Sequence, residues 1–182
     1  MNKLEKAFAL FDAYNRQDPN IISWQDKNFP AEYFYALKLY EWVIKLSPGA
    51  GESLLLASRS QHIGRWKIQR DEYPKGKAGY YKWRTDLAKF HADTTGALML
   101  QAGYDNDDIK AVQRIILKEN LRNDAEVQVM EDALCLVFLQ FQLGDFVLKH
   151  DEEKVIQILK KTWTKMNQQG RDAALTLLWN KN

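Results

Sequence analysis

The stretch EVQVMEDALCLVFL, residues 126–139, has apolar side chains on nearly every side of a helix. A helix that is hydrophobic all round is buried, so we expect this segment to lie at the centre of an all-helical fold. Two adjacent carboxylates, Glu131 and Asp132, interrupt it and point about 100° apart around the helix axis. A buried carboxylate is costly unless it is paired or bound to a cation. The stretch therefore predicts a helical core whose acidic groups have partners elsewhere in the chain.

Helical spacing of apolar residues recurs on both sides of this stretch, and no alternating pattern indicates a strand. Before it, we expect helices over residues 4–14, 31–46, 52–61 and 80–103, with a loop at 69–79. Helices over 108–118, 124–143, 152–163 and 171–179 complete the pattern, with Asp105 and Asn123 as N-caps and Gly144 as an interruption. The prediction is an all-α fold, a single domain of residues 1–182 with roughly seven or eight helices.

The composition is that of an ordinary globular domain, with 182 residues, 46% of them hydrophobic and 27% charged. The longest purely apolar run, Ala133 to Leu139, is too short to span a bilayer, so we expect no membrane partner. The N-terminus lacks the pattern of a signal peptide. The single cysteine, Cys135, excludes an intramolecular disulfide, and a cytoplasmic location is expected.

Positive charge is concentrated in residues 59–89. This segment holds nine basic and three acidic residues, a net charge of +6, whereas the whole chain carries +2 and the remainder therefore −4. Such a concentration attracts anions. Arginine forks match phosphate oxygens, and tryptophan or tyrosine faces can stack on a base. We expect an anionic phosphorylated small molecule as partner, with nucleic acid as an alternative, and assign substrate binding to Arg59, Gln61, Arg65, Trp66 and Arg84.

Two of the three histidines lie at the end or in the middle of apolar helices. His62 follows the run LLLAS and precedes Ile63 and Gly64, a natural helix stop. His91 lies within the long helix expected over 80–103, whereas His150 lies in a polar connection. Asp132 then has two possible partners: an internal arginine such as Arg59 or Arg84, or a metal ion shared with His62 and His91. The residue types alone leave both interpretations open.

The order of three motifs resembles the HD metal-dependent phosphohydrolase superfamily, which is all-helical: QHIGRW (61–66), FHADTTGALMLQAGY (90–104) and EVQVMEDALCLVFL (126–139). More closely, QHIGRW, FHA and EDALCLVFL resemble an uncharacterised family, domain of unknown function 4202, which is thought to be HD-like. That resemblance covers most of residues 29–141. His91, with Gly96 five residues later, matches the later histidine of the HD pattern, and Asp132 matches its last aspartate.

The chain departs from the HD pattern at the motif itself. Where HD proteins carry a His-Asp pair, this chain has Gln61-His62, and no histidine lies upstream of His62. Glu41, on the preceding expected helix, is the best substitute for the upstream ligand, and Glu32 is a weaker one.

The resemblance implies a metal-dependent phosphohydrolase acting on a phosphorylated, nucleotide-like substrate. One divalent ion (Mn, Fe, Ni or Zn) would be held by His62, His91, Asp132 and Glu41, a set of nitrogen and oxygen ligands that suits these metals. Glu131 or Glu41 would accept the proton of a metal-activated water. The alternative is a non-catalytic HD-like module that binds nucleotide or RNA through the basic, aromatic segment 59–89, and the missing upstream histidine favours it. A purely structural interaction protein is a third possibility.

Overall fold

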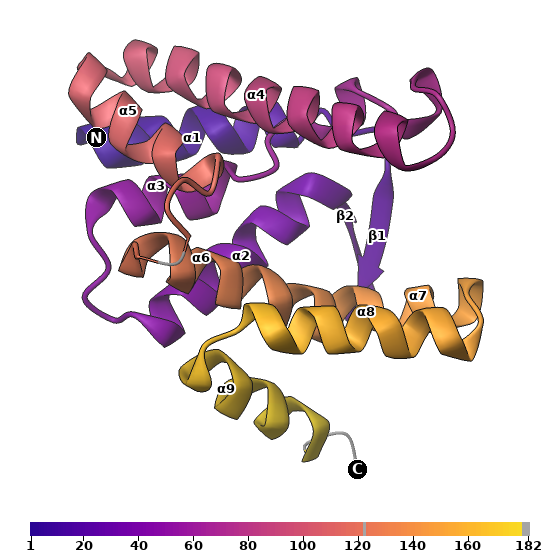
Figure 1. Ribbon diagram of the computed structural model, residues 1–182. Coiled ribbons are helices and arrows are strands. Elements are labelled where there is room, and N and C mark those ends of the chain that lie inside the picture. The colour runs from indigo at the N-terminus through magenta and orange to yellow at the C-terminus, as the bar shows by residue number, and fades with distance from the viewer. Residues whose placement is uncertain (122, 180–182) are drawn as a thin grey trace.

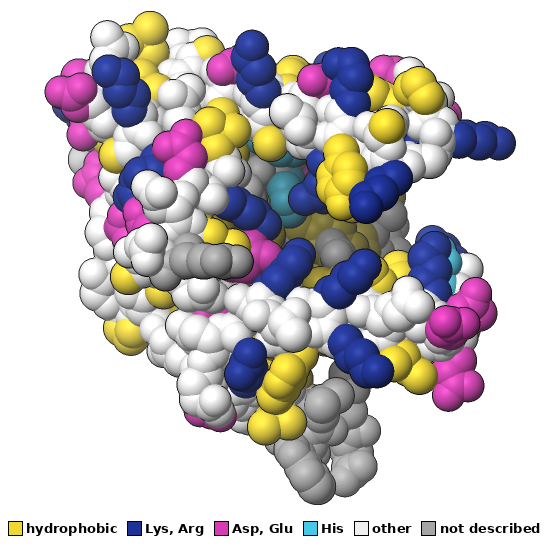
Figure 2. All heavy atoms as spheres, in the orientation of Figure 1, with side chains coloured by type: hydrophobic (Ala, Val, Ile, Leu, Met, Phe, Trp, Pro, Cys, Tyr) yellow, Lys and Arg dark blue, Asp and Glu magenta, His cyan; other side chains and the backbone are white. Residues whose placement is uncertain are grey.

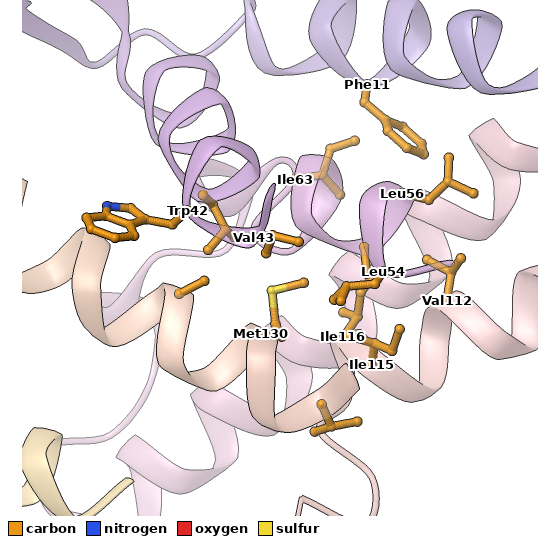
Figure 3. Packing of buried hydrophobic residues seen from close by; sticks show 14 of the residues in the cluster. Phe11, Trp42, Val43, Leu54, Leu56, Ile63, Val112, Ile115, Ile116 and Met130 are labelled. Atoms are coloured by element: carbon orange, nitrogen blue, oxygen red, sulfur yellow. The ribbon is translucent and has the colours of Figure 1, made fainter. Parts of the chain in front are cut away.

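The central helix is where the sequence predicts it. The computed structural model describes residues 1–121 and 123–179. In it, α6 (Ala125–Val137) packs against α2 (Ala31–Leu46), and Val127, Met130 and Leu136 have no exposed surface. Figure 3 shows Met130 pointing toward Val43 of α2 within this buried cluster. The N-cap is Asp124 instead of Asn123, because the Asp124 carboxylate accepts hydrogen bonds from the backbone N–H groups of Glu126 and Val127.

The helices form two groups on either side of α2 and α3 (Glu52–Ser60), as Figure 1 shows. One group contains α1 (Lys3–Asn15), α4 (Lys77–Ala102) and α5 (Asn106–Ile116). The other contains α6, α7 (Leu143–Lys149), α8 (Glu152–Lys165) and α9 (Gln168–Trp179). Two short 3₁₀ turns, η1 (Arg65–Lys67) and η2 (Arg70–Glu72), connect α3 to α4.

The expected helix boundaries need three corrections. Helix α4 begins at Lys77 instead of Tyr80, so its first turn lies within the expected loop, and a disturbance expected near Gly96 is absent, since the helix is continuous there. Gly144 does not interrupt its helix. The irregularity lies just before it, in the π-helical turn η3 (Phe138–Gln142), whose Gln140 Oε1 accepts a hydrogen bond of 2.9 Å from Trp42 Nε1.

A β-hairpin contradicts the expectation that the chain has no strands. Strands β1 (Ile21–Trp24) and β2 (Lys27–Pro30) pair antiparallel, with Trp24 opposite Lys27. The two residues between them, Gln25 and Asp26, have φ angles of 49° and 61°. Two-residue hairpin turns with both φ angles positive usually contain Asn-Gly or Asp-Gly. The Gln-Asp sequence therefore hid the turn, and with it the hairpin.

The all-α class is confirmed, with nine α-helices in residues 1–121 and 123–179 where seven or eight were expected. The expected domain of residues 1–182 includes residue 122 and residues 180–182, which lie outside the described residues. No helix of the described part of the chain combines the length and the apolar character that a membrane span requires.

Candidate anion-binding site

The turn after α3 positions the first histidine. His62 and Ile63 follow Gln61, the C-cap of α3, and Gly64 then adopts a left-handed φ of 67°. A Cβ atom at Gly64 would lie 2.8 Å from a ring carbon of Tyr14 and 2.9 Å from one of Phe90. Only glycine fits this backbone conformation and this close approach without a shift of its neighbours. The turn therefore fixes where the chain leaves α3 and enters the cationic segment.

This turn also orients His91, which lies on α4. The Nδ1 atom of His91 is 2.7 Å from the carbonyl oxygen of Ile63, and the ring centroids of His62 and His91 are 5.7 Å apart. A carbonyl oxygen only accepts, so Nδ1 carries the proton and donates it. Nε2 then presents a lone pair in the neutral ring, and this buried atom has no hydrogen-bond partner among the described residues.

Both histidines line a pocket of about 80 Å³, which we call the anion pocket. Its walls come from the turn after α3, from α4 and from the end of α5. Figure 2 shows a histidine at the bottom of a hollow whose mouth is surrounded by lysine and arginine side chains. The pocket is lined by Gln61, His62, Arg65, Arg84, Leu87, Ala88, His91, Ile116, Leu117 and Lys118.

The electrostatics of the pocket keep both imidazoles neutral. Burial is the main cause that lowers the pKa of His62 well below its usual value, and the charge of Arg65 lowers it further. Burial likewise lowers the pKa of His91 to about 4, although the bond to the Ile63 carbonyl opposes this shift. Positive charge here therefore comes from Arg65, Arg84 and Lys118, not from the histidines.

Lys118 reaches the pocket from the end of α5 and is held there by Glu131. Its ammonium group pairs with the Glu131 carboxylate, which also lies 3.4 Å from the ammonium of Lys165. Burial would raise the pKa of Glu131, but the two lysines outweigh it and leave the pKa lowered. Glu131 does not line the anion pocket. Glu131, which was predicted to accept a proton from water, is instead paired with Lys118 outside the pocket.

A second, smaller hollow adjoins the first, since Gln61 and His62 line both. It contains Glu32, whose Oε1 lies 4.0 Å from the Nε atom of Arg65. Burial raises the pKa of Glu32 to about 7, although Arg65 opposes this shift. The carboxylate next to His62 is therefore Glu32, the weaker of the two sequence candidates. Glu41 is exposed and pairs with Lys38 at 3.0 Å.

Asp132 forms no salt bridge with an arginine of residues 1–121 and 123–179, and its closest partners are amide groups. Its Oδ1 accepts a hydrogen bond of 3.0 Å from the backbone N–H of Asn167 and one of 2.9 Å from Gln128 Nε2. Burial nevertheless raises its pKa. The interpretation that Asp132 pairs with Arg59 is wrong, because Arg59 forms a bidentate pair of 2.8 Å bonds with Asp12.

The predicted metal ligands do not come together as one group. Among residues 1–121 and 123–179, no three or more histidine, cysteine, aspartate or glutamate side chains are arranged to hold a metal ion. Of the predicted set, the structure brings together only His62 and His91 in the anion pocket. The residues that the resemblance assigns to a metal therefore fit such an ion only in part.

A comparison with known families matches residues 5–182 to the family described as Domain of unknown function (DUF4202). The chain belongs to this family. No curated protein and no solved structure matched the chain.

Three of the five substrate-binding residues predicted for this DUF4202 chain line the anion pocket: Gln61, Arg65 and Arg84. Gln61 is fixed by its Nε2, which donates a 3.0 Å hydrogen bond to the Ile116 carbonyl. Arg59 is committed to Asp12, and the ring of Trp66 packs 6.0 Å from that of Tyr14. Neither of these two residues lines the pocket.

The site residues predicted for this DUF4202 chain did not include Lys118, which lines the anion pocket, and included Glu32 only as the weaker substitute for the upstream ligand, although Glu32 shares a hollow with His62. Lys118 directly follows the apolar residues Ile115, Ile116 and Leu117, so its position at a helix end beside the core was the available signal. Glu32 follows Pro30 in the first turn of α2, where the sequence gives no sign that the carboxylate is buried. Both assignments depend on how α2 and α5 pack against the turn after α3.

Proposed function

We propose that the anion pocket binds the phosphate group of a small phosphorylated molecule. The observation that carries this proposal is the convergence of Arg65, Arg84 and Lys118, from three separate parts of the chain, on one pocket. Guanidinium and ammonium groups form charge-assisted hydrogen bonds with phosphate oxygens. The pocket volume of about 80 Å³ suits a compact anionic group more than a whole nucleotide.

The neutral histidines add a proton requirement to this proposal. His91 Nε2 offers a lone pair, which repels a fully ionised phosphate oxygen unless one of the two partners carries a proton. A bound anion stabilises the charged form of a nearby histidine. Phosphate binding is therefore expected to be accompanied by proton uptake, or to select the monoanionic form of the ligand.

Titration calorimetry with inorganic phosphate tests the proposal. Arg84 is exposed and has no salt bridge among the described residues, so Arg84→Gln removes a pocket charge without disturbing the core. A hydrogen bond to a charged group contributes about 1.5–3 kcal/mol, so the affinity should fall by about tenfold or more. Lys75→Gln, the same loss of charge at an exposed position of the same basic segment, should change it by less than about twofold. Equal effects of the two substitutions, or no binding by the unmodified protein, would contradict the proposal.

A second candidate is metal-dependent hydrolysis of a phosphate ester, as the HD resemblance implies. The orientation of His91 supports it, because metal-binding histidines usually donate their other ring N–H to a carbonyl or carboxylate oxygen. His62 would supply a second imidazole nitrogen. Asp132 and Glu41 have other partners, so the donor set is incomplete and no hydrolytic step follows from it.

Metal analysis separates this candidate from simple phosphate binding. The protein is incubated with Mn²⁺ or Zn²⁺, freed of excess ion, and analysed beside His62→Ala. The hydrolase hypothesis predicts one tightly bound ion, its loss in His62→Ala, and turnover of a phosphomonoester that a chelator abolishes. Phosphate binding without stoichiometric metal would leave the first proposal standing and reject the second.

A further inference from the structure

A second, larger groove adjoins the anion pocket along α4 and α5. It has a volume of about 620 Å³, and Arg84, Ala88 and Leu117 line both it and the anion pocket. The two hollows therefore adjoin at these residues, so a ligand whose phosphate lies in the pocket has the groove beside it. Binding sites for small organic ligands typically measure about 300–1,000 Å³, so the groove is large enough for the rest of such a molecule.

The groove lining changes from aromatic to polar along its length. Tyr81 lies three residues before Arg84, about 4.5 Å along the helix axis, and is 58% exposed. Asp93 and Gln113 lie toward the other end. Gln113 donates its Nε2 to the Ala92 carbonyl at 3.0 Å, which fixes the amide and leaves its oxygen as an acceptor.

Close packing of α4 on α5 creates this polar end. A Cβ atom at Gly96 would lie 2.9 Å from Gln113 Nε2 and 3.0 Å from a methyl carbon of Ile109, so glycine lets Gln113 lie across α4. Ala88 and Ala92, which have small side chains, also line the groove. The groove thus has small alanine side chains along its length, the exposed ring of Tyr81 at one end and the hydrogen-bond acceptors Gln113 and Asp93 at the other.

We infer that this groove binds the nucleoside part of a nucleoside monophosphate whose phosphate lies in the anion pocket and whose base stacks on Tyr81. This inference rests on the proposed phosphate site, from which the ligand extends. A base ring stacks on an exposed aromatic side chain without needing a particular sequence of hydrogen bonds. Asp93 lies twelve residues after Tyr81 on α4, about 18 Å along the helix axis, so a nucleoside stacked on Tyr81 does not reach the polar end of the groove.

Calorimetry with a set of related ligands tests the inference. Inorganic phosphate, ribose 5-phosphate and adenosine monophosphate are compared on the unmodified protein and on Tyr81→Ala. Adenosine monophosphate should bind at least tenfold tighter than inorganic phosphate. Tyr81→Ala should weaken its binding at least fivefold, the lower end of what one stacked base contributes, and leave inorganic phosphate within about twofold.

Two further variants isolate the role of the ring. Tyr81→Phe keeps the stacking face and should retain the affinity for adenosine monophosphate. Tyr80→Ala removes a neighbouring exposed tyrosine that does not line the groove, and should behave like the unmodified protein. If Tyr80→Ala and Tyr81→Ala weaken the nucleotide equally, the assignment of Tyr81 is wrong.

Different results would contradict the groove assignment and the phosphate site. If inorganic phosphate binds through Arg84 but adenosine monophosphate binds no tighter, the groove assignment fails and the phosphate site stands. If no phosphorylated ligand binds, both fail. A single-stranded octanucleotide that binds more than about a hundredfold tighter than the mononucleotide would overturn the inference in favour of a nucleic-acid surface.

Discussion

Glu32 is a carboxyl group that folding takes out of water without giving it a close counterion. Its side chain is 12% exposed, and the nearest arginine nitrogen, Nε of Arg65, is 4.0 Å away. Because burial outweighs the attraction of Arg65, the pKa rises to about 7. A carboxyl group with such a pKa exchanges a proton near neutral pH, which is the property expected of a functional acid or base.

The raised pKa of Glu32 predicts a pH-dependent gain in stability for Glu32→Gln. Between its usual pKa of 4.5 and about 7, the folded state holds this proton more tightly than the unfolded state does. Stability contributed by Glu32 is therefore greatest below pH 4.5 and falls as the pH rises toward 7. Glutamine avoids the ionisation, so at pH 8 the variant should be more stable by on the order of 1–3 kcal/mol, with little difference at pH 5.

Urea unfolding at pH 5 and pH 8 measures this difference. Glu41→Gln is the matched control, since Glu41 is exposed and its pair with Lys38 should contribute less than about 1 kcal/mol. A Glu32→Gln variant that is less stable than the unmodified protein at pH 8 would show that the pair with Arg65 outweighs the cost of burial.

The sequence predicted which residues belong to the site better than it predicted which residues they contact. His62, His91 and the two arginines at 65 and 84 were predicted as site residues, and all four line the anion pocket. Their types and charge alone pointed to them. Asp132 was correctly expected to be buried with partners, but the partners are the Asn167 backbone and Gln128, neither of which spacing along the chain could indicate.

The end of helix α5 holds Lys118 in an uncommon backbone conformation. Lys118 has a φ angle of 57°, its N–H bonds to the Ile115 carbonyl, and the N–H of Glu119 bonds to the Arg114 carbonyl. This hydrogen-bond pattern ends many helices and usually places glycine at the left-handed position. A lysine there costs stability but places an ammonium group at the anion pocket.

Two substitutions at Lys118 should differ in stability by about 1 kcal/mol. Both Lys118→Gly and Lys118→Ala remove the ammonium group and its pair with Glu131, so their difference reports the backbone alone. Glycine adopts the left-handed conformation without the clash that alanine suffers, so the glycine variant should be the more stable. The free energies of unfolding of the two variants give the measurement.

The same pair of substitutions at Lys110, an exposed right-handed position within α5, provides the control. There the order should reverse, because glycine is the poorer residue inside a helix. Equal stabilities of the two Lys118 variants would show that the left-handed conformation is not a source of strain.

Elements with a strong apolar period were predicted well, and those defined by turn chemistry were not. Helix α5 begins at its predicted N-cap, Asp105, whose carboxylate accepts from the N–H groups of Asp107 and Asp108. The hairpin was missed because Gln25 and Asp26 are unusual in its turn. The π-helical turn η3 is invisible to the apolar pattern, because its one-residue change of register occurs within a continuous apolar stretch.

In the whole molecule, a nearly neutral chain presents a local concentration of positive charge at a hollow. The chain carries a net +2, yet three cations meet at the anion pocket and cationic side chains surround the mouth in Figure 2. The charge asymmetry of residues 59–89 predicted an anion-facing segment. It could not predict that Lys118, from outside that segment, completes the pocket, because this depends on the packing of α5 beside α4.

Anion binding to this pocket should strengthen as the pH falls. Sulfate keeps its charge between pH 6 and 8, so any change reflects the protein. A bound dianion competes with Glu32 for Arg65 and favours protonated His62, so binding takes up protons. Uptake of one full proton would raise the affinity about tenfold per pH unit. Partial uptake gives less, so the affinity for sulfate should rise about threefold or more from pH 8 to pH 6.

Titration calorimetry at pH 6, 7 and 8 provides the measurement, and Glu32→Gln should have a shallower pH dependence than the unmodified protein. An affinity that does not change with pH would mean that neither Glu32 nor the histidines respond to the bound anion.

The hydrogen bond from Gln61 to the Ile116 carbonyl has a consequence for how the molecule is made. It joins residues 55 positions apart, and the bond between His91 and Ile63 spans another 28. During synthesis the turn after α3 leaves the ribosome well before α5 exists, so the anion pocket closes late. A ligand for it therefore recognises only chains that already contain α5, and at a hundred times its Kd it would stabilise the folded chain by about 2.7 kcal/mol against unfolding.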